Sequence, residues 1–124
     1  MKALAAHLLS GRTAEARAAA HLQAQGLTIV ARNYRVTGGE IDLIARHGAE
    51  LVFVEVRSRR SAAFGSAAET VTASKRRRIG LAAQHYLLGL SQRALPPCRF
   101  DVVSIEGAVD AAPVQWLQNA FTLD

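Results

Sequence analysis

Two short apolar runs separated by a polar turn constrain the fold of this chain more than any other part of its sequence. The runs span residues 41–45 and 51–56, and the residues between them include Gly48, which suits a tight turn. Runs of this length that are rich in β-branched residues predict β-strands. We therefore expect two adjacent antiparallel strands, paired as a hairpin, near the middle of the chain.

Each predicted strand carries a carboxylate at a place where an apolar side chain is expected. Side chains alternate along a strand, so Glu55 shares a face with Phe53 and Arg57 within a strongly apolar run. Asp42 is flanked by the apolar residues of the other strand. An isolated ionised carboxylate in such surroundings costs several kcal/mol unless it is paired or binds a metal ion. Both residues are therefore candidates for a functional site.

The loop of the hairpin decides how the two carboxylates face each other. A four-residue loop from His47 to Glu50 would place Asp42 directly opposite Glu55. A two-residue loop would place Asp42 opposite Phe53 and leave Glu55 diagonal to it. Both registers keep the two carboxylates within reach of one ion.

Oxygen ligands on neighbouring strands favour a hard divalent cation. Two acids held close together repel each other unless a cation lies between them, and carboxylates suit Mg²⁺ or Mn²⁺. We therefore expect Asp42 and Glu55 to bind Mg²⁺ or Mn²⁺. The alternative is that Glu55 pairs with Arg57 or Arg59, and Asp42 with another surface arginine, as ordinary ion pairs at a sheet end.

The net charge of +5 is concentrated in one segment of the chain. Residues 57–78 hold seven of the Lys and Arg residues against one acidic residue, whereas the flanking parts are close to neutral or negative. A basic segment beside a candidate active site predicts binding to the phosphates of a nucleic acid, with DNA as the favoured partner; a solvated, arginine-rich loop and helix start is the alternative. The candidate nucleic-acid-binding residues are Arg59, Arg60, Lys75, Arg76, Arg77 and Arg78.

The remaining patterns predict an α/β sandwich. Alanine-rich residues 11–25 and the apolar spacing that follows Ser74, its expected cap, predict two helices. Residues 27–34, 99–105 and 114–117 predict three further strands, the last at an edge, and residues 58–73 predict a flexible loop. The expected order is α-β-β-β-α-β-β, with a mixed sheet flanked by helices, in one domain over residues 1–124.

The compartment can be predicted from what the sequence lacks. Cys98 is the single cysteine, so no intrachain disulfide forms, and a reducing cytoplasmic location is expected. No apolar stretch is long enough to span a bilayer, and the N-terminal apolar run is short and leads directly into charged residues, which argues against a signal peptide. We expect no membrane association.

Several motifs together resemble those of the YraN-like family of uncharacterised bacterial proteins. The resemblance extends over nearly the whole chain, and its most specific part is the pair of motifs that contain the two carboxylates. The residues that carry it are Gly11-Arg12-Thr13-Ala14-Glu15-Ala16, Ala31-Arg32-Asn33-Tyr34-Arg35, Gly39-Glu40-Ile41-Asp42-Leu43-Ile44-Ala45, Phe53-Val54-Glu55-Val56-Arg57, Arg99-Phe100-Asp101-Val102-Val103 and Asn119-Ala120-Phe121.

The resemblance implies a fold related to restriction endonucleases and archaeal Holliday junction resolvases. It also implies that Asp42 and Glu55 are the acidic ligands of a PD-(D/E)xK nuclease site, that Glu15 completes the acidic cluster, and that position 57 holds the basic residue of the motif. This chain has Arg57 there instead of the usual lysine. A guanidinium stays charged at any working pH, so Arg57 can orient a phosphate but cannot activate water. The resolvase-like relatives further imply a homodimer. Glu15 also lies in the first turn of its predicted helix, where an acid is an ordinary partner of the helix dipole.

Three hypotheses for function remain open from the sequence. The first is an Mg²⁺-dependent nuclease acting on DNA, on branched or damaged structures, with Asp42, Glu55, Arg57 and Glu15 as its catalytic residues. The second is a nucleic-acid-binding module that keeps the endonuclease scaffold but cleaves poorly, which the missing lysine favours. The third is a protein-interaction factor whose basic segment docks on an acidic partner and needs no metal.

Overall fold

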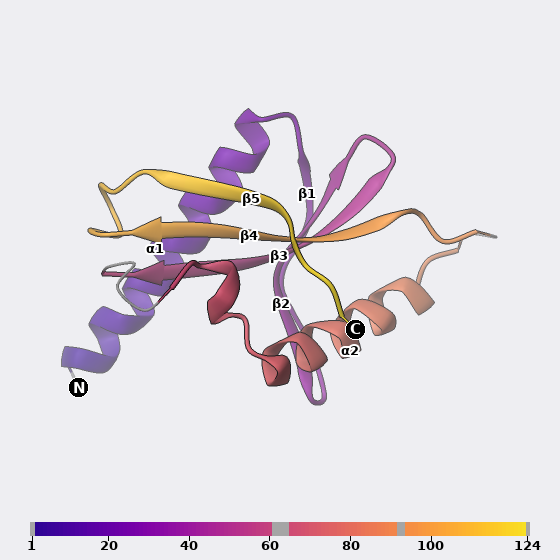
Figure 1. The fold of residues 1–124 in the computed structure, drawn as a ribbon, viewed down its shortest axis with the longest axis horizontal. Coiled ribbons are helices and arrows are strands. Elements are labelled where there is room, and N and C mark those ends of the chain that lie inside the picture. The colour runs from indigo at the N-terminus through magenta and orange to yellow at the C-terminus, as the bar shows by residue number, and fades with distance from the viewer. Residues whose placement is uncertain (1, 61–64, 92–93, 124) are drawn as a thin grey trace.

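The computed structural model describes residues 2–60, 65–91 and 94–123. It contains a five-stranded sheet and two long helices, shown in Figure 1. The α/β class and the order α-β-β-β-α-β-β predicted from the sequence are confirmed. In chain order the elements are α1 (Lys2–Ala24), β1 (Thr28–Val36), β2 (Gly39–His47), β3 (Glu50–Arg59), the short 3-10 helix η1 (Ala68–Thr70), α2 (Ala73–Leu88), β4 (Cys98–Glu106) and β5 (Val114–Phe121).

The sheet is mixed, as predicted, and its strands follow one another in space in the order β1-β2-β3-β4-β5. The pairs β1–β2, β2–β3 and β4–β5 are antiparallel, whereas β3 and β4 are parallel. A parallel pair needs a crossover connection, and α2 provides it. The strand that carries Glu55 is therefore central, and α2 lies directly downstream of it.

The register of the hairpin between β2 and β3, extended by one residue beyond its last pair, sets Asp42 against Glu55. His47 pairs with Glu50, and the ladder runs back through the pair Leu43 and Val54. The turn itself consists of only two residues, Gly48 and Ala49. The predicted link between a two-residue loop and a diagonal arrangement is therefore wrong, because His47 and Glu50 belong to the ladder and not to the loop.

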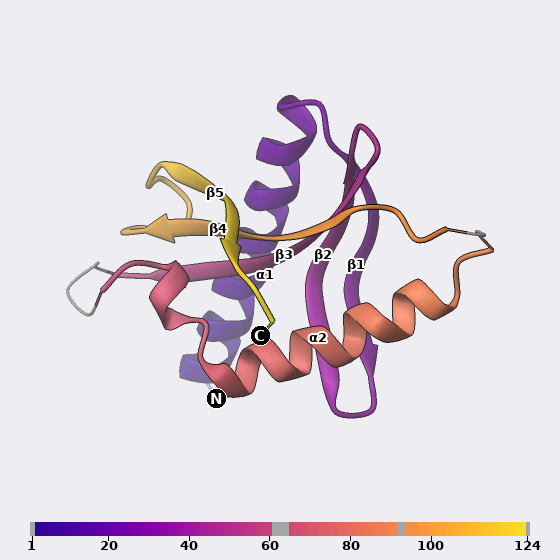
Figure 2. The same ribbon diagram turned by 45° about the vertical axis from the view of Figure 1, so that its right-hand side comes forward.

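The two helices pack on opposite faces of the sheet, as Figures 1 and 2 show. Under α1, Leu22 packs with Leu43, Val54 and other small or branched side chains. Under α2, Ile79 and its neighbours pack with Phe53 in a larger cluster. Because both faces of β2 and β3 are buried, the sequences of these strands are nearly continuous apolar runs. The core thus leaves little room for charge on either side of these strands.

Several predicted boundaries need correction. Helix α1 begins at Lys2 and not at Gly11, because the alanine-rich N-terminal run continues the helix. Strand β1 begins at Thr28 and continues to Val36, and the edge strand β5 continues to Phe121. Ser74 is not the cap of α2: Thr72 holds that position, and its hydroxyl accepts a hydrogen bond from the Lys75 amide.

The predicted loop over residues 58–73 is more ordered than expected at both ends. Strand β3 continues to Arg59, and η1 follows shortly before α2. Ala67 and Val71 are buried in the cluster under α2. Residues 61–64, which belong to this predicted loop, lie outside the described residues. No helix of the described chain is long and apolar enough to cross a membrane.

Candidate active site

Strands β2 and β3 diverge at the position of the two carboxylates. Their paired ladder ends at Leu43 and Val54, and Figures 1 and 2 show β2 turning away from β3 beyond this point. The Asp42 side chain bridges the two strands there: its Oδ2 accepts a hydrogen bond of 2.8 Å from the backbone N–H of Val56. The divergence therefore leaves a space between the strands, with the Asp42 carboxylate at its base.

A hollow of about 430 Å³ occupies this space. All four elements around the divergence contribute to it, so the hollow joins segments that are far apart in the sequence. It brings together the four predicted catalytic residues and Lys75, but none of the other predicted nucleic-acid-binding residues. Its lining consists of Ser10, Gly11, Ala14 and Glu15 from α1, Glu40 and Asp42 from β2, Glu55, Val56, Arg57 and Ser58 from β3, and Lys75 from α2.

The surroundings of Asp42 disfavour the ionised form of its carboxyl group. Burial, and next the neighbouring charge of Glu55, raise the pKa of Asp42 to about 7, with Glu15 adding to the rise. The hydrogen bond from the Val56 amide opposes this rise without cancelling it. Among the side chains that the structure describes, no Lys, Arg or His forms an ion pair with Asp42. The alternative in which a surface arginine neutralises Asp42 therefore has no support in the described residues.

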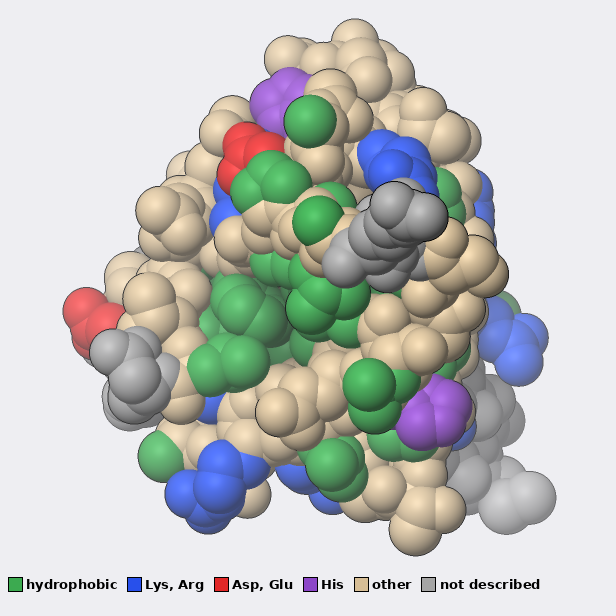
Figure 3. All heavy atoms as spheres, turned by 90° about the vertical axis from the view of Figure 1, so that its right-hand side faces the viewer, with side chains coloured by type: hydrophobic (Ala, Val, Ile, Leu, Met, Phe, Trp, Pro, Cys, Tyr) green, Lys and Arg blue, Asp and Glu red, His purple; other side chains and the backbone are tan. Residues whose placement is uncertain are grey.

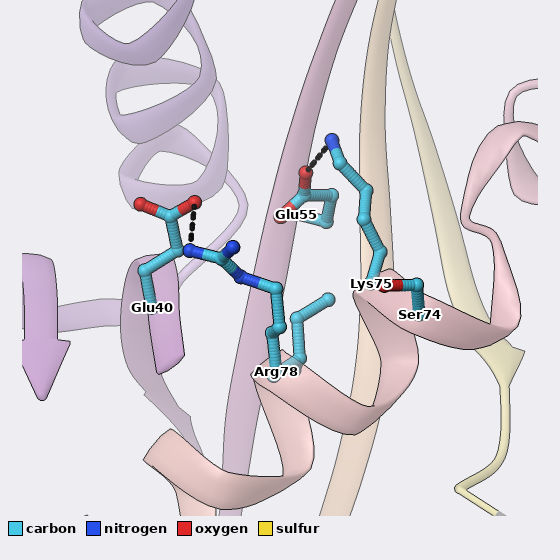
Figure 4. A pocket seen from close by; sticks show the side chains of 6 residues that line it. Glu40, Glu55, Ser74, Lys75 and Arg78 are labelled. Carbon is cyan, nitrogen blue, oxygen red and sulfur yellow. Dashed lines mark hydrogen bonds and ion pairs between the residues drawn. The ribbon is translucent and has the colours of Figure 1, made fainter. Parts of the chain in front are cut away.

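Glu55 is nearly buried and is approached by two cations. Its Oε1 accepts a hydrogen bond of 3.1 Å from the Lys75 ammonium, in the first turn of α2, as Figure 4 shows. Arg57 is more distant, with 3.9 Å between its guanidinium and the same oxygen. The alternative of an ordinary ion pair is thus partly realised, with Lys75 as the main partner. Arg59, the other suggested partner, is bonded elsewhere.

Arg57 is fixed in the hollow by a neighbour from η1. Its Nε donates a hydrogen bond of 3.1 Å to the Thr70 hydroxyl, which in turn donates to the carbonyl of Ala67. Two N–H-bearing nitrogens of the guanidinium remain outside this contact, and the side chain is partly exposed. Arg57 can therefore present charge to a ligand from a defined position.

The donor set of the hollow suits a hard divalent cation. Four carboxylates (Glu15, Glu40, Asp42 and Glu55) face two cations there, which leaves an excess of negative charge. Within the described ranges no three His, Cys, Asp or Glu side chains are close enough to hold a metal ion by themselves. Mg²⁺ does not need such a cage, since it commonly binds one or two carboxylates and keeps waters and substrate oxygens. Asp42 and Glu55 fit this pattern.

The predicted nucleic-acid-binding residues divide into two groups. Arg59 is bonded to Glu106 at 2.6 Å and to the Gly65 carbonyl, and Arg76 donates to the Val71 carbonyl and stacks over Phe121. The ion pair with Glu106 argues against a direct role of Arg59 in binding, whereas Arg76 is hydrogen-bonded through Nε alone. In the other group, Arg60, Arg77 and Arg78 are exposed, and Lys75 is half-buried beside Glu55.

Sequence reasoning missed two features of the site. It did not anticipate that Thr70 would position Arg57, because nothing local to either residue indicates the contact. It considered Lys75 only as a helix-end lysine able to reach a phosphate, and not as the partner of Glu55. The N-cap at Thr72 would have placed Lys75 in the first turn of α2, but only the packing of α2 on the sheet brings that turn to β3.

Comparison with known proteins identifies the family. The family model described as "Uncharacterised protein family UPF0102" matches residues 14–105. A UPF0102 protein of Saccharophagus degradans is 54% identical over 121 residues, covering 98% of this chain and 99% of the relative. Another, from Paracidovorax citrulli, is 58% identical over 116 residues, covering 90% of this chain and 82% of the relative. The chain therefore belongs to the UPF0102 family, and the resemblance to the YraN-like proteins found in its motifs is confirmed.

Proposed function

We propose that this protein is a metal-dependent nuclease that hydrolyses phosphodiester bonds in DNA. The observation that carries the proposal is that Asp42 and Glu55 line one open hollow, at the place where β2 and β3 separate. Two cations, Lys75 and Arg57, lie beside them. Ion pairing explains Glu55 in part but leaves Asp42 as a partly buried acid with no cationic partner among the described residues. A divalent cation explains both residues together.

Each residue of the hollow has a role that its position supports. Asp42 and Glu55 would hold Mg²⁺ or Mn²⁺ between β2 and β3, and Glu15 on α1 would add negative charge nearby. A bound ion of this kind stabilises charge on the phosphate and lowers the pKa of a coordinated water. Arg57, fixed by Thr70, would donate hydrogen bonds to the phosphate oxygens.

Lys75 offers a lysine for the nuclease site, whose motif position holds Arg57 instead of the usual lysine. Its ammonium already lies 3.1 Å from a proposed metal ligand, so it is placed to contact the phosphate or the attacking water. The missing lysine of the motif is thus compensated from α2, which favours the nuclease over the inactive binding module.

The experiment is a cleavage assay with labelled single-stranded, duplex and four-way-junction DNA. Each substrate is incubated with the wild-type protein and with Asp42→Ala in Mg²⁺, in Mn²⁺ and in EDTA. We expect cleavage only with metal, and a rate lower in Asp42→Ala by a factor on the order of 100 or more, since an essential ligand is lost. Asp110→Asn, a change of one exposed carboxylate at the β4–β5 turn, is the control and should cleave normally.

Two further variants separate the roles of the cations. Lys75→Ala should reduce the rate by at least about tenfold, whereas Arg57→Lys should retain activity because it restores the motif residue. DNA binding without cleavage in every condition would overturn the nuclease proposal and favour the binding module. If no DNA binding is found and Asp42→Ala changes nothing, the protein-interaction hypothesis gains instead.

A further inference from the structure

A second hollow, of about 210 Å³, adjoins the proposed metal site on the side of α2. It shares Glu40, Glu55 and Lys75 with the larger hollow, so the two lie side by side. Its other walls come from Ser74, Arg78 and Ile79 on α2. Figure 4 shows Lys75 and Arg78 reaching from α2 toward β3 and β2 respectively. The residues of this hollow have no role in the mechanism above, apart from those it shares with the metal site.

The two cations of this hollow lie on one face of α2. Lys75 and Arg78 are three residues apart, a spacing that places side chains on the same side of a helix. The intervening arginines point elsewhere: Arg76 packs against Phe121, and Arg77 lines a separate hollow near Leu123. The helix therefore directs the four consecutive basic residues 75–78 to different sides. Only two of them, Lys75 and Arg78, face this hollow.

Glu40 already occupies the position of an anion between two arginines. Its Oε1 lies 3.6 Å from the Arg78 guanidinium, and its Oε2 lies 3.9 Å from that of Arg35 on β1. All three side chains are about half exposed or more, so solvent weakens these contacts and a stronger anion can replace them. A phosphate offers more oxygens to a guanidinium than one carboxylate does, and it pairs with the fork of donors of arginine.

We propose that this second hollow binds a backbone phosphate of the nucleic acid, adjacent to the phosphate held at the metal site. Arg78 and the Ser74 hydroxyl contact this phosphate, and Lys75 stands between the two positions. Glu40 acts as its internal competitor, pairing with Arg78 until the nucleic acid binds. The nucleic-acid strand consequently runs across the first two turns of α2. This inference rests on the proposed function only in taking a nucleic acid as the ligand.

The test measures binding in EDTA, where no cleavage occurs. Fluorescence anisotropy of a short labelled duplex, and of its single strand, is recorded over a range of salt concentrations. Arg78→Ala should weaken binding by about three- to tenfold and reduce the salt slope by about one. Arg77→Ala removes the same charge from the same helix turn and is the matched control, expected to lose less than about twofold because its side chain faces away.

Glu40→Gln removes a negative charge instead of a positive one and provides a more specific test. It should tighten binding more in the wild-type background than in the Arg78→Ala background, because part of its effect depends on freeing Arg78, while the freeing of Arg35 is common to both. Asp110→Asn controls for loss of one negative charge at a distant site. Equal losses in Arg78→Ala and Arg77→Ala, or a gain from Glu40→Gln that is undiminished without Arg78, would overturn the proposal.

The outcomes also separate this inference from the proposed function. A specific effect of Arg78 on binding, without cleavage in any metal, would support the phosphate site and reject the nuclease. Cleavage that requires Asp42, with Arg78 and Arg77 equivalent in binding, would reject the phosphate site and leave the nuclease in place.

Discussion

Asp101, which is fully buried, and Asp42, which is partly buried, differ in how their charge is compensated. Asp101 on β4 is fully buried and accepts hydrogen bonds from Arg99, Trp116 and the backbone of Asn119. Asp42 accepts one backbone hydrogen bond and faces a second carboxylate, which helps to raise its pKa to about 7. A charge that is left incompletely compensated costs stability. The charge of Asp101 is thus fully compensated within the fold, whereas that of Asp42 is not, which is consistent with the proposed cation.

The raised pKa of Asp42 predicts how stability depends on pH. The folded protein binds a proton at Asp42 more tightly than the unfolded chain does, so this group stabilises the fold fully below about pH 4. That contribution is lost as the pH rises through about 7. Asp42→Asn cannot ionise, so in EDTA at pH 8 it should raise the free energy of unfolding by about 1–3 kcal/mol. Urea unfolding at pH 8 and pH 5 measures this difference.

The gain from Asp42→Asn should shrink at pH 5, where wild-type Asp42 is protonated. Mg²⁺ should stabilise the wild-type protein at pH 8 and leave the variant unchanged, since the variant lacks a ligand. Asp110→Asn, which alters an exposed carboxylate, should show neither effect. A variant less stable than the wild type at pH 8 would contradict the burial argument.

Helix α2 is the element that completes the site, and one glycine sets its distance from the sheet. A Cβ on Gly39, at the start of β2, would lie 2.5 Å from the carbonyl oxygen of Arg78 and 3.0 Å from the amide of Ala82. No side chain can be accommodated there without moving the helix. The close approach brings Lys75 to Glu55 and Arg78 to Glu40. The packing of α2 on β2 thus determines which cations reach the carboxylates.

Gly39→Ala should therefore destabilise the fold and disturb the site together. We expect a loss of about 1–3 kcal/mol in the free energy of unfolding, because backbone atoms of α2 must shift to admit the methyl group. Gly11→Ala is the matched control: no atom lies within 4 Å of its Cβ position, and it lies inside α1. Chemical denaturation should show that Gly11→Ala is neutral or more stable by about 0.5–1 kcal/mol. Equal stability of the two variants would refute the close-packing argument.

At the scale of the whole molecule, charge and apolar surface are separated. The carboxylates and their cations gather at the divergence of β2 and β3, where the N-terminal end of α2 meets the sheet. Figure 3 shows the face on the right-hand side of Figure 1, where apolar side chains gather near the centre and Lys and Arg lie mainly toward the margins.

A separate polar network holds β4 to β5 and to the β2–β3 hairpin. Arg99 donates to Asp101, to Glu50 and to His47, so it joins strands that are distant in the sequence. The β4–β5 register shifts between Phe100 and Val102, where Asp101 receives the Asn119 amide. The network has its hydrogen bonds satisfied, and among the described side chains no buried polar atom lacks a partner.

Asp101→Ala should destabilise the protein strongly without altering the site. It leaves Arg99 largely buried with one of its two carboxylate partners removed, for an expected loss of about 3–5 kcal/mol in the free energy of unfolding. Urea denaturation measures the loss, and Asp110→Ala is the exposed control. Stabilisation by Mg²⁺ should be retained wherever the variant is folded. A loss below about 1 kcal/mol would contradict the structural role of Asp101.

The sequence determined the strands, the hairpin, the mixed α/β class and the two carboxylates, because alternation and apolar runs are local signals that burial on both faces of a sheet reinforces. It did not determine which cations serve the site. The partners of Arg57, Arg59 and Lys75 are Thr70, Glu106 and Glu55, contacts between different elements. The pairing of β3 with β4, the position of η1 and the close approach of α2 decided them, since all three depend on how the twisted sheet and the helices pack in three dimensions.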